Sequence, residues 1–496
     1  MLNDLLNGFY TLLNPSYILI LIIGSFFGIV FGAIPGLGPV IGATLLIPFT
    51  YHINPAAGIL LIAGVYVAGT FGGSQTAILF NIPGAPENTC TKIDGYPLTQ
   101  KGQAAKALSI AIVASAIGGI FSSIILIFGS TRLMTISYLF GPVEYFALTL
   151  LGMSIIVGLS KNFFKGLLSG FLGIFLSTVG MSSIDGTLRF TFGSKFLLNG
   201  FNFVPIMIGV YAIAEVFYQV KIHFNFNTGK KVKFKMEFPK KKDLKYVKNT
   251  IARSSLLGLI IGALPGAGAV LANYMGYSME ESVNKNNKIP FGNGNLRGVA
   301  APEAANNSAA VATFIPLLAL GIPGGAVTAI LLGVFEINGI NPGPTLLTTN
   351  KEMVYTLFAG ILIINILILL TGFLEVKVIT KLLKVPKHYL FPAIFIFASV
   401  GAYSVNNSFF DVLIMVIFGL IGYYMKKYGY SVAILVLGLV LGPIMENNLL
   451  RGLIKYNNNP FMFFTKPLGA LFLIISVSFF LWPLFYKIQN IYKNNA

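Results

Sequence analysis

The chain has 496 residues, of which 55% are hydrophobic and only 10% are charged, and its mean hydropathy is +0.79. Globular domains carry about 25% charged residues, so this composition excludes a soluble protein and predicts one embedded in membrane lipid. The formal net charge of +18 would suit nucleic acid, but basic residues gather in the cytoplasmic loops of membrane proteins, and we therefore expect no nucleic-acid binding.

Apolar runs long enough to cross a bilayer, which takes about 20 residues, recur along the whole chain. The clearest lie at 17–34, 56–80, 105–128, 140–159, 199–220, 252–271, 353–374, 406–424 and 467–486. Together with shorter or interrupted segments they predict an all-α polytopic membrane protein with roughly 10–13 transmembrane segments, including broken or re-entrant helices. The N-terminal segment lacks Lys and Arg, which argues against a cleaved signal peptide, and the single cysteine, Cys90, excludes an internal disulfide.

The first interrupted segment is GAIPGLGPV at 32–40, where three glycines and two prolines stand inside an apolar run. Backbone groups freed in hydrocarbon cost several kcal/mol each unless protein or a cavity surrounds them. We therefore expect Pro35–Gly36 to break a helix near membrane depth and the freed backbone to line a protected cavity. A second interruption follows in GGSQTAILFNIPGAPENT at 72–89.

A basic segment divides the chain near its middle. Residues 221–253 hold eleven Lys and Arg against Glu237 and Asp243, whereas no Lys or Arg precedes Lys92. Short loops rich in Lys and Arg face the cytoplasm, so we expect this loop to be cytoplasmic. The segments 377–387 and 425–429 are expected on the same side, with two crossings between them at 389–402 and 406–424, and the N-terminus is expected outside.

The motifs of the first half return in the second half. GALPGAGAV at 262–270 is identical to GAIPGLGPV at six of nine positions, and GIPGGA at 321–326 follows it as NIPGAP at 81–86 follows the first motif. The same order at similar offsets predicts two structural repeats. Only the second is preceded by the basic loop, so the repeats would enter the membrane from opposite sides, as in many secondary transporters. The predicted division is a first repeat at 1–220, the basic loop at 221–253, and a second repeat with C-terminal helices at 254–496.

Interrupted segments in corresponding positions of two repeats predict a transport site. Half-helix N-termini attract carboxylates, and short polar side chains stand near both pairs of breaks. The candidate substrate-binding residues are Pro35, Gly36, Gly38, Ser74, Gln75, Thr76, Pro83, Gly84, Pro265, Gly266, Gly268, Asn306, Asn307, Ser308, Pro323 and Gly324. Na⁺ is a candidate ligand near Gly36, Asn81, Gly266 and Asn307, and Arg297 and Glu303 are candidate charge partners. Kinks, close packing and interhelical hydrogen bonds are the structural alternative for each residue.

These long motifs, with DGYPLTQKGQAAKAL (94–108), GVAAPEAANN (298–307) and LGIPGGAVTAILLGVFEINGINPGPTLL (320–347), resemble the large membrane subunit of the tripartite tricarboxylate transporters, the TctA family. The resemblance implies a multi-pass permease of the bacterial inner membrane that imports di- or tricarboxylates such as citrate. It also implies two partners, a periplasmic solute-binding protein and a small four-helix membrane subunit. The family usually has an acid just before GVAAPEAANN, where this chain has Leu296-Arg297, which leaves the carboxylate open.

Charge balance predicts a coupling ion, and no other cofactor is expected. Two helix N-termini offer together about +1, whereas a fully ionised tricarboxylate carries −3, and moving the remaining charge inward costs about 2.3 kcal/mol per charge per 100 mV. We therefore expect cotransport of Na⁺ or H⁺.

The sequence favours a carrier over three other functions. A membrane-embedded enzyme is disfavoured because His52, His223 and His388 are widely separated and HExxH, GxSxG and Walker motifs are missing. An anion channel is disfavoured by the repeat of broken helices, and an assembly scaffold by the intact paired motifs.

Overall fold

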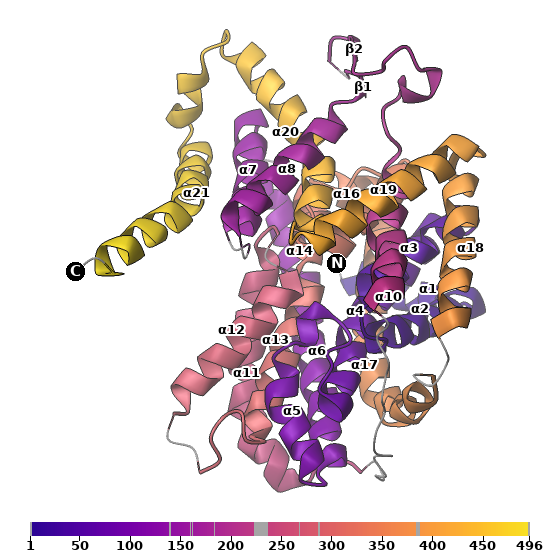
Figure 1. Cartoon of the computed structure of the whole chain (residues 1–496), viewed down its shortest axis with the longest axis vertical. Helices are drawn as coiled ribbons and strands as arrows, with labels where there is room; N and C mark the ends of the chain where they lie inside the picture. The colour runs from indigo at the N-terminus through magenta and orange to yellow at the C-terminus, as the bar shows by residue number, and fades with distance from the viewer. Residues whose placement is uncertain are drawn as a thin grey trace.

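The computed structural model describes residues 2–137, 140–158, 160, 162–182, 184–222, 237–266, 268–285, 288–382 and 387–494. Its regular structure is helical apart from a two-residue antiparallel ribbon, β1 (Gly180–Met181) with β2 (Leu188–Arg189). Eight described helices are long and apolar enough to cross a membrane, and five further apolar helices are shorter. The prediction of an all-α polytopic protein is therefore confirmed (Figure 1).

The helices of the first half come in the following order along the chain: α1 (Leu2–Leu12), α2 (Pro15–Ala33), α3 (Gly38–Thr50), α4 (Pro55–Phe80), η1 (Pro86–Asn88), α5 (Thr91–Gln100), α6 (Ala104–Ser137), α7 (Pro142–Gly158), α8 (Phe163–Ser177), η2 (Lys195–Leu197), α9 (Phe203–Met207), η3 (Ile208–Ile213) and α10 (Ala214–Ile222). The starts of α2 and α4 follow directly from the sequence. Asn14 and Asn54 accept hydrogen bonds from backbone amides two residues on, and a proline fills the first helical position of each helix.

The second half continues with α11 (Lys241–Ala263), α12 (Gly268–Val283), α13 (Leu296–Ala312), α14 (Phe314–Leu320), α15 (Ala326–Ile337), α16 (Leu346–Thr349), α17 (Lys351–Leu382), α18 (Lys387–Asn406), α19 (Phe409–Lys427), α20 (Val432–Lys455), η4 (Pro460–Thr465) and α21 (Pro467–Asn494). The apolar run predicted at 252–271 is not one crossing, because the helix ends at Ala263 and a new one begins at Gly268. Helix α11 also begins inside the predicted basic loop. Within that loop 223–236, with His223, lie outside the described residues, as do 383–386 of the predicted cytoplasmic segment 377–387.

A central bundle, formed by α2–α6 with α11–α17, contains the same packing twice. In the first half α2 crosses α4, and in the second half α11 crosses α13, through glycines that leave no space for a side chain. A Cβ on these glycines would lie 2.1–2.6 Å from a carbonyl oxygen of α4 or α13. The pairs are Gly28 with Val65, Gly32 with Gly69, Gly258 with Ala305, and Gly262 with Ala309. Glycine permits this approach because it has no Cβ. The glycines are 230 residues apart and the carbonyls 240, so the two halves repeat at the level of single residues.

The two halves of the central bundle start from opposite ends. At one end, the first end, Tyr17 Oη donates to Asn54 Oδ1 (3.4 Å), and Lys351 lines the same pocket as these two residues, so α2, α4 and α17 begin together. Helix α6 runs antiparallel to α17, since Gly372 lies against Ile112. The start of α6 therefore marks the other end, the second end. There Lys106 pairs with Asp243 and Lys101 bonds the carbonyl of Asn293, next to the starts of α11 and α13.

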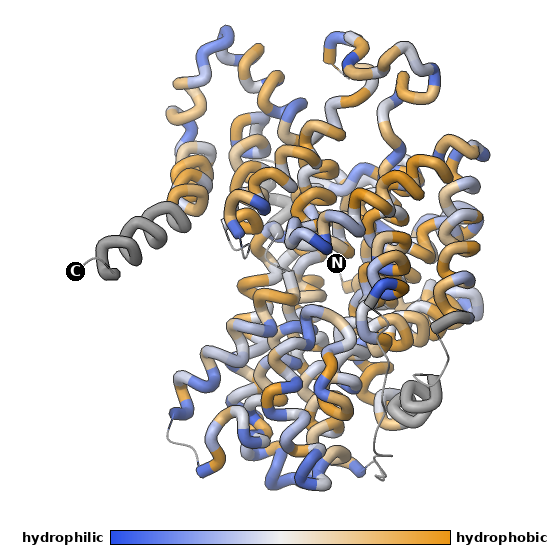
Figure 2. Tube along the Cα trace, viewed as in Figure 1, coloured by the Kyte–Doolittle hydropathy of each residue, from blue (hydrophilic) through white to orange (hydrophobic). Residues whose placement is uncertain are grey.

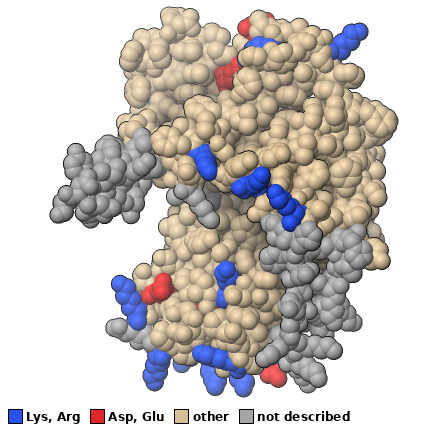
Figure 3. All heavy atoms as spheres, in the orientation of Figure 1, with Lys and Arg blue, Asp and Glu red and all other residues tan. Residues whose placement is uncertain are grey.

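The remaining helices flank the central bundle, and each hairpin packs against the opposite half of the chain. Helices α7 and α8 pack on α20, and α18 and α19 pack on α9, η3 and α10. Figure 1 shows α7, α8, α20 and α21 at upper left and α10, α18 and α19 at right. Apolar residues run along these helices (Figure 2). Lys and Arg gather at the lower tip of the molecule in Figure 3, where Figure 1 places α5 and α11.

Candidate functional site

Two loops with paired glycines separate α2 from α3 and α11 from α12. The φ angles are 90° at Gly36 and 67° at Gly38 in the first loop, and 82° at Gly266 and 64° at Gly268 in the second. This region of backbone conformation favours glycine, because a Cβ would collide with the chain. Both expected helix breaks are therefore present, and their glycines share one backbone conformation.

The breaks in NIPGAP and GIPGGA also match. Helix α4 ends on Asn81 with φ 60°, and α14 ends on Gly321 with φ 69°, so both close with a left-handed residue. The chain is then extended at Ala85 and at Gly325 before η1 and α15 begin.

Within each half the two breaks lie against one another. A Cβ on Gly38 would be 3.5 Å from Cβ of Ala85, and a Cβ on Gly268 would be 3.7 Å from the carbonyl oxygen of Gly324. We call Gly36, Gly38 and residues 81–85 the first junction, and Gly266, Gly268 and residues 321–325 the second junction. The first junction thus brings the N-terminus of α3 beside the segment that leads into η1. The second brings the N-terminus of α12 beside the segment that leads into α15.

The two junctions are linked through α4 and α13. Asn306 Nδ2 on α13 donates to the carbonyl oxygen of Glu87, just after the first junction (2.8 Å). Tyr66 on α4 packs against Phe314, with 6.3 Å between the ring centroids, and Thr313 lies beside Gly324 of the second junction. Each half therefore contacts residues that lie next to the junction of the other half.

The predicted polar residues are fully buried, but they divide into two groups. Three hydroxyls already donate to backbone carbonyls: Ser74 to Phe71, Thr76 to Gly73, and Ser308 to Ser255. In the part of the chain that the structure describes, the side-chain nitrogen and oxygen of both Gln75 and Asn307 have no hydrogen-bond partner. Because burying an unpaired amide is costly, these two are the strongest candidates to bond a ligand.

The other predicted residues lie mainly in the junction loops. Pro35, Pro83 and Gly84 lie in or beside the first junction, and Pro265, Pro323 and Gly324 lie in or beside the second. Of the positions suggested for Na⁺, the first junction holds Gly36 and Asn81, the second holds Gly266, and Asn307 lies on α13. Their roles in binding stay predictions.

The two charged candidates, Glu303 and Arg297, are not brought together. Glu303 is fully buried and accepts hydrogen bonds from Thr91 Oγ1 (2.5 Å) and Ser115 Oγ (2.9 Å). Arg297 lies six residues earlier on α13, about 9 Å along the helix. Its guanidinium stacks 4.4 Å from the ring centroid of Tyr246 and bonds Asn284. Arg297 therefore links α13 to α11 and to the residue that follows α12.

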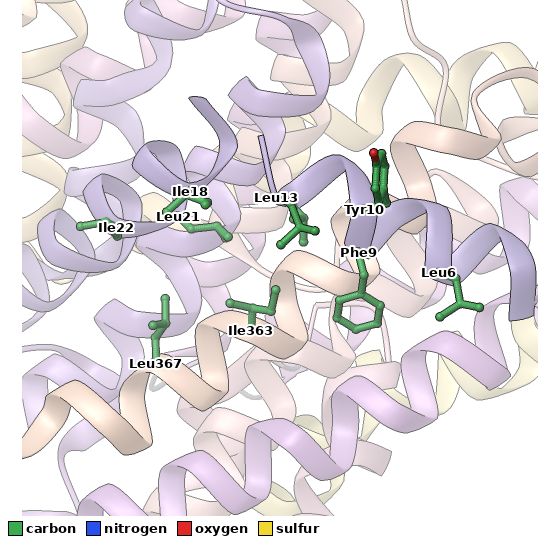
Figure 4. A pocket seen from close by; sticks show the side chains of 10 residues that line it. Leu6, Phe9, Tyr10, Leu13, Ile18, Leu21, Ile22, Ile363 and Leu367 are labelled. Atoms are coloured by element: carbon green, nitrogen blue, oxygen red, sulfur yellow. The ribbon is translucent and has the colours of Figure 1, made fainter. Parts of the chain in front are cut away.

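A surface pocket of about 450 Å³ lies away from the junctions (Figure 4). It is lined by side chains of α1, α2 and α17, including Phe9, Leu13, Ile22 and Ile363. Its lining is almost wholly apolar, so it offers nothing to bind a carboxylate. A second pocket of about 480 Å³ is more polar and lies at the first end, among Tyr17, Asn54 and 349–353.

Comparison with known protein families decides what the paired breaks belong to. The family described as "Tripartite tricarboxylate transporter TctA family" matches residues 18–437, which include both junctions. The chain belongs to the TctA family. It is therefore a multi-pass membrane component of a tripartite tricarboxylate transporter, and not an enzyme.

Two relatives of this TctA protein come from Agrobacterium vitis. One, named "Uncharacterized 52.8 kDa protein in TAR-I ttuC' 3'region", is 36% identical over 479 residues, covering 96% of this chain and 95% of the relative. The other, named "Uncharacterized protein in TAR-II ttuC' 3'region", is 42% identical over 213 residues, covering 43% of this chain and 88% of the relative. No solved structure matches the chain.

Sequence reasoning missed the role of Asp94 in this TctA protein. Its carboxylate accepts hydrogen bonds from the amides of Gly294 (2.8 Å) and Asn295 (2.7 Å) and from Tyr277 Oη (2.9 Å). Asp94 on α5 thus caps the N-terminus of α13, although 200 residues separate them. Burial raises the pKa of Asp94 above its ordinary value, and the bonds from these amides oppose that shift. The DGYPL segment gave no local signal of such a contact.

Proposed function

We propose that the protein is the permease subunit of a cation-coupled uptake system for a di- or tricarboxylate. In this proposal a periplasmic solute-binding protein delivers the substrate, and a small four-helix membrane subunit completes the complex in the bacterial inner membrane. The observation that carries the proposal is the pair of junctions, each formed by two helix breaks of matching conformation. Membership of the TctA family supports it.

The junctions have the chemistry to bind a carboxylate. Helices α3, α12 and α15 begin there with 13, 16 and 12 residues, and a helix N-terminus presents unpaired amides and about half a positive charge. The glycines let an anion approach the backbone closely. The side-chain amides of Gln75 and Asn307, which have no partner in the described part of the chain, would add hydrogen bonds.

The distribution of charge suggests how the protein is oriented. Basic residues gather at the second end, with Lys101, Lys106 and Arg253 beside the basic loop. The positive-inside rule places that end in the cytoplasm. The first end, with its polar pocket at Tyr17 and Asn54, then faces the periplasm, where the binding protein would deliver substrate.

The test is uptake into proteoliposomes that contain the protein and its small subunit. Labelled citrate, a smaller dicarboxylate such as succinate, and the binding protein are supplied outside, with an inward Na⁺ or proton gradient. We expect saturable accumulation that needs the binding protein and one of the gradients. Flux that neither saturates nor accumulates would instead indicate an anion channel.

The variant Asn307→Ala tests the site within the same assay, with Ser308→Ala as the matched control on α13. Among the described residues the amide of Asn307 has no partner, whereas Ser308 bonds Ser255 and Ser122. We expect Asn307→Ala to weaken substrate affinity about five- to tenfold, since a buried hydrogen bond is worth about 1–1.5 kcal/mol. Equal affinities in the two variants would remove Asn307 from the site.

A further inference from the structure

We propose that Glu303 holds the coupling cation, either a proton or Na⁺, and that Asn88 and Asn306 connect this site to the first junction. This inference rests on the cation-coupled uptake proposed above and names the residue that carries the charge. Glu303 lies in the middle of α13 and is fully buried. The sequence suggested only a charge partner or an acid at an interface.

Buried charges are normally paired or bind a cation, yet Glu303 forms no ion pair with any described residue. Two basic side chains on neighbouring helices pair with other acids: Arg253 of α11 with Glu280 of α12, and Lys106 of α6 with Asp243. The compensating charge must therefore come from outside the protein.

The groups around Glu303 suit a carboxylate that gains and loses a cation. Thr91 and Ser115 contact its two oxygens through hydroxyls (2.5 and 2.9 Å). A hydroxyl donates to a carboxylate, accepts from a carboxylic acid, or offers a lone pair to Na⁺. Gly118 brings α6 against the carbonyl of Ala304, so this contact is tight and excludes bulk solvent.

Two amides join this carboxylate to the first junction. Asn88 Nδ2 lies 3.4 Å from Glu303 Oε1 and also donates to the carbonyl of Thr70, while its Oδ1 and the amide of Ala85 both lie beside Gly73. Asn306, one turn from Glu303, donates to the carbonyl of Glu87. The oxygens of both amides lack a hydrogen-bond partner among the described residues. A change of charge at Glu303 thus acts on the segment that forms the first junction.

Other titratable groups packed against α13 do not offer an equivalent site. On α5, Asp94 is held by Tyr277 of α12. Cys90 is a buried thiol whose backbone amide bonds Asn273. Glu87 on η1 is another buried acid, but among the described residues no hydroxyl bonds its carboxylate as Thr91 and Ser115 bond that of Glu303. The residue 240 positions before Glu303 is Ala63, so the first repeat carries no matching acid.

The test compares gradient-driven accumulation with exchange in the same proteoliposomes. Exchange of labelled for unlabelled carboxylate needs only the substrate site, whereas accumulation needs the bound cation to be released and rebound. We expect Glu303→Gln to keep exchange and to lose accumulation. The matched control is Glu280→Gln, an equally buried acid that has Arg253 as its counterion, and we expect it to keep both.

The driving ion separates the two sources of charge. If a pH gradient alone drives accumulation by the wild type, the coupling cation is the proton. If an inward Na⁺ gradient drives accumulation with a protonophore present, the coupling cation is Na⁺. Accumulation by Glu303→Gln equal to wild type would overturn the inference. Absence of exchange in the wild type would instead remove the proposed function itself.

A second variant covers the case in which Glu303→Gln does not fold. Ser115→Ala removes one contact of the carboxylate, and Ser109→Ala is its control on the same helix, because Ser109 bonds only the carbonyl of Lys106 among the described residues. We expect Ser115→Ala to shift the half-saturating concentration of the coupling ion about tenfold. No shift relative to Ser109→Ala would contradict the assignment.

Discussion

Replacing Gly84 by alanine tests whether the first junction depends on a backbone contact that leaves no room for a methyl group. A Cβ at Gly84 would lie 2.0 Å from the carbonyl oxygen of Gly32 and 2.7 Å from Cα of Gly73. Carbon atoms pack at about 3.5–4.0 Å, so the backbone must move by about 1 Å. Overpacking costs about 1–3 kcal/mol, and we expect the upper end because both obstacles are backbone.

The assay is thermal unfolding of the purified protein in detergent, followed by uptake in proteoliposomes. We expect Gly84→Ala to lower the melting temperature and to abolish uptake, since α2 and α4 can no longer meet at the junction. The control is Gly129→Ala on α6, where the nearest atom would be 3.8 Å away. Alanine is favoured over glycine in helices by about 1 kcal/mol, so this control keeps or gains stability. Wild-type stability and uptake in Gly84→Ala would refute the reasoning.

Three further predictions follow from the same contacts. Gly36→Val and Gly266→Val each abolish uptake at normal membrane expression, because a β-branched residue does not adopt φ of 90° or 82°; uptake and immunoblotting check this. Asp94→Asn lowers the melting temperature, since it weakens charged hydrogen bonds worth about 1.5–3 kcal/mol each. Arg297→Ala leaves carboxylate affinity in competition assays unchanged, because its guanidinium stacks on Tyr246. Normal uptake by the two valine variants would contradict the first prediction, and an unchanged melting temperature of Asp94→Asn would contradict the second. A weaker carboxylate affinity of Arg297→Ala would contradict the third.

The repeated motifs predicted the breaks correctly because glycine and proline act locally. Gly36 and Gly266 need a left-handed backbone in any context, and the prolines beside them limit how far a helix can continue. The paired spacing and the basic loop also predicted two repeats that enter the membrane from opposite sides, and that division of the chain stays a prediction. The helix breaks depend on short stretches of chain, so the sequence alone was enough to predict them.

Contacts between distant segments were out of reach of such reasoning. The alanine-rich helices at 296–320 were not recognised as apolar runs, although they form the centre of the bundle, because small residues pack well but score weakly in hydropathy. Asp94 and Glu303 find their partners across about 200 residues of sequence. The sequence predicted substrate binding for both Ser308 and Asn307. Only the packed helices reveal that the hydroxyl of Ser308 already has hydrogen-bond partners, whereas the amide of Asn307 has none among the described residues.

Each flanking hairpin packs on the opposite half of the chain, and this has a consequence for how the protein is made. Helix α8 is complete at Ser177, but α20, on which it packs, begins only at Val432. At about 5–20 residues per second, the ribosome needs roughly 10–50 s to supply the missing partner. In the folded protein Gly173 packs directly against the carbonyl oxygen of Leu435. Until α20 is made, Gly173 faces lipid or an insertion factor instead. The hairpin of α7 and α8 must therefore wait in the bilayer until α20 has been synthesised.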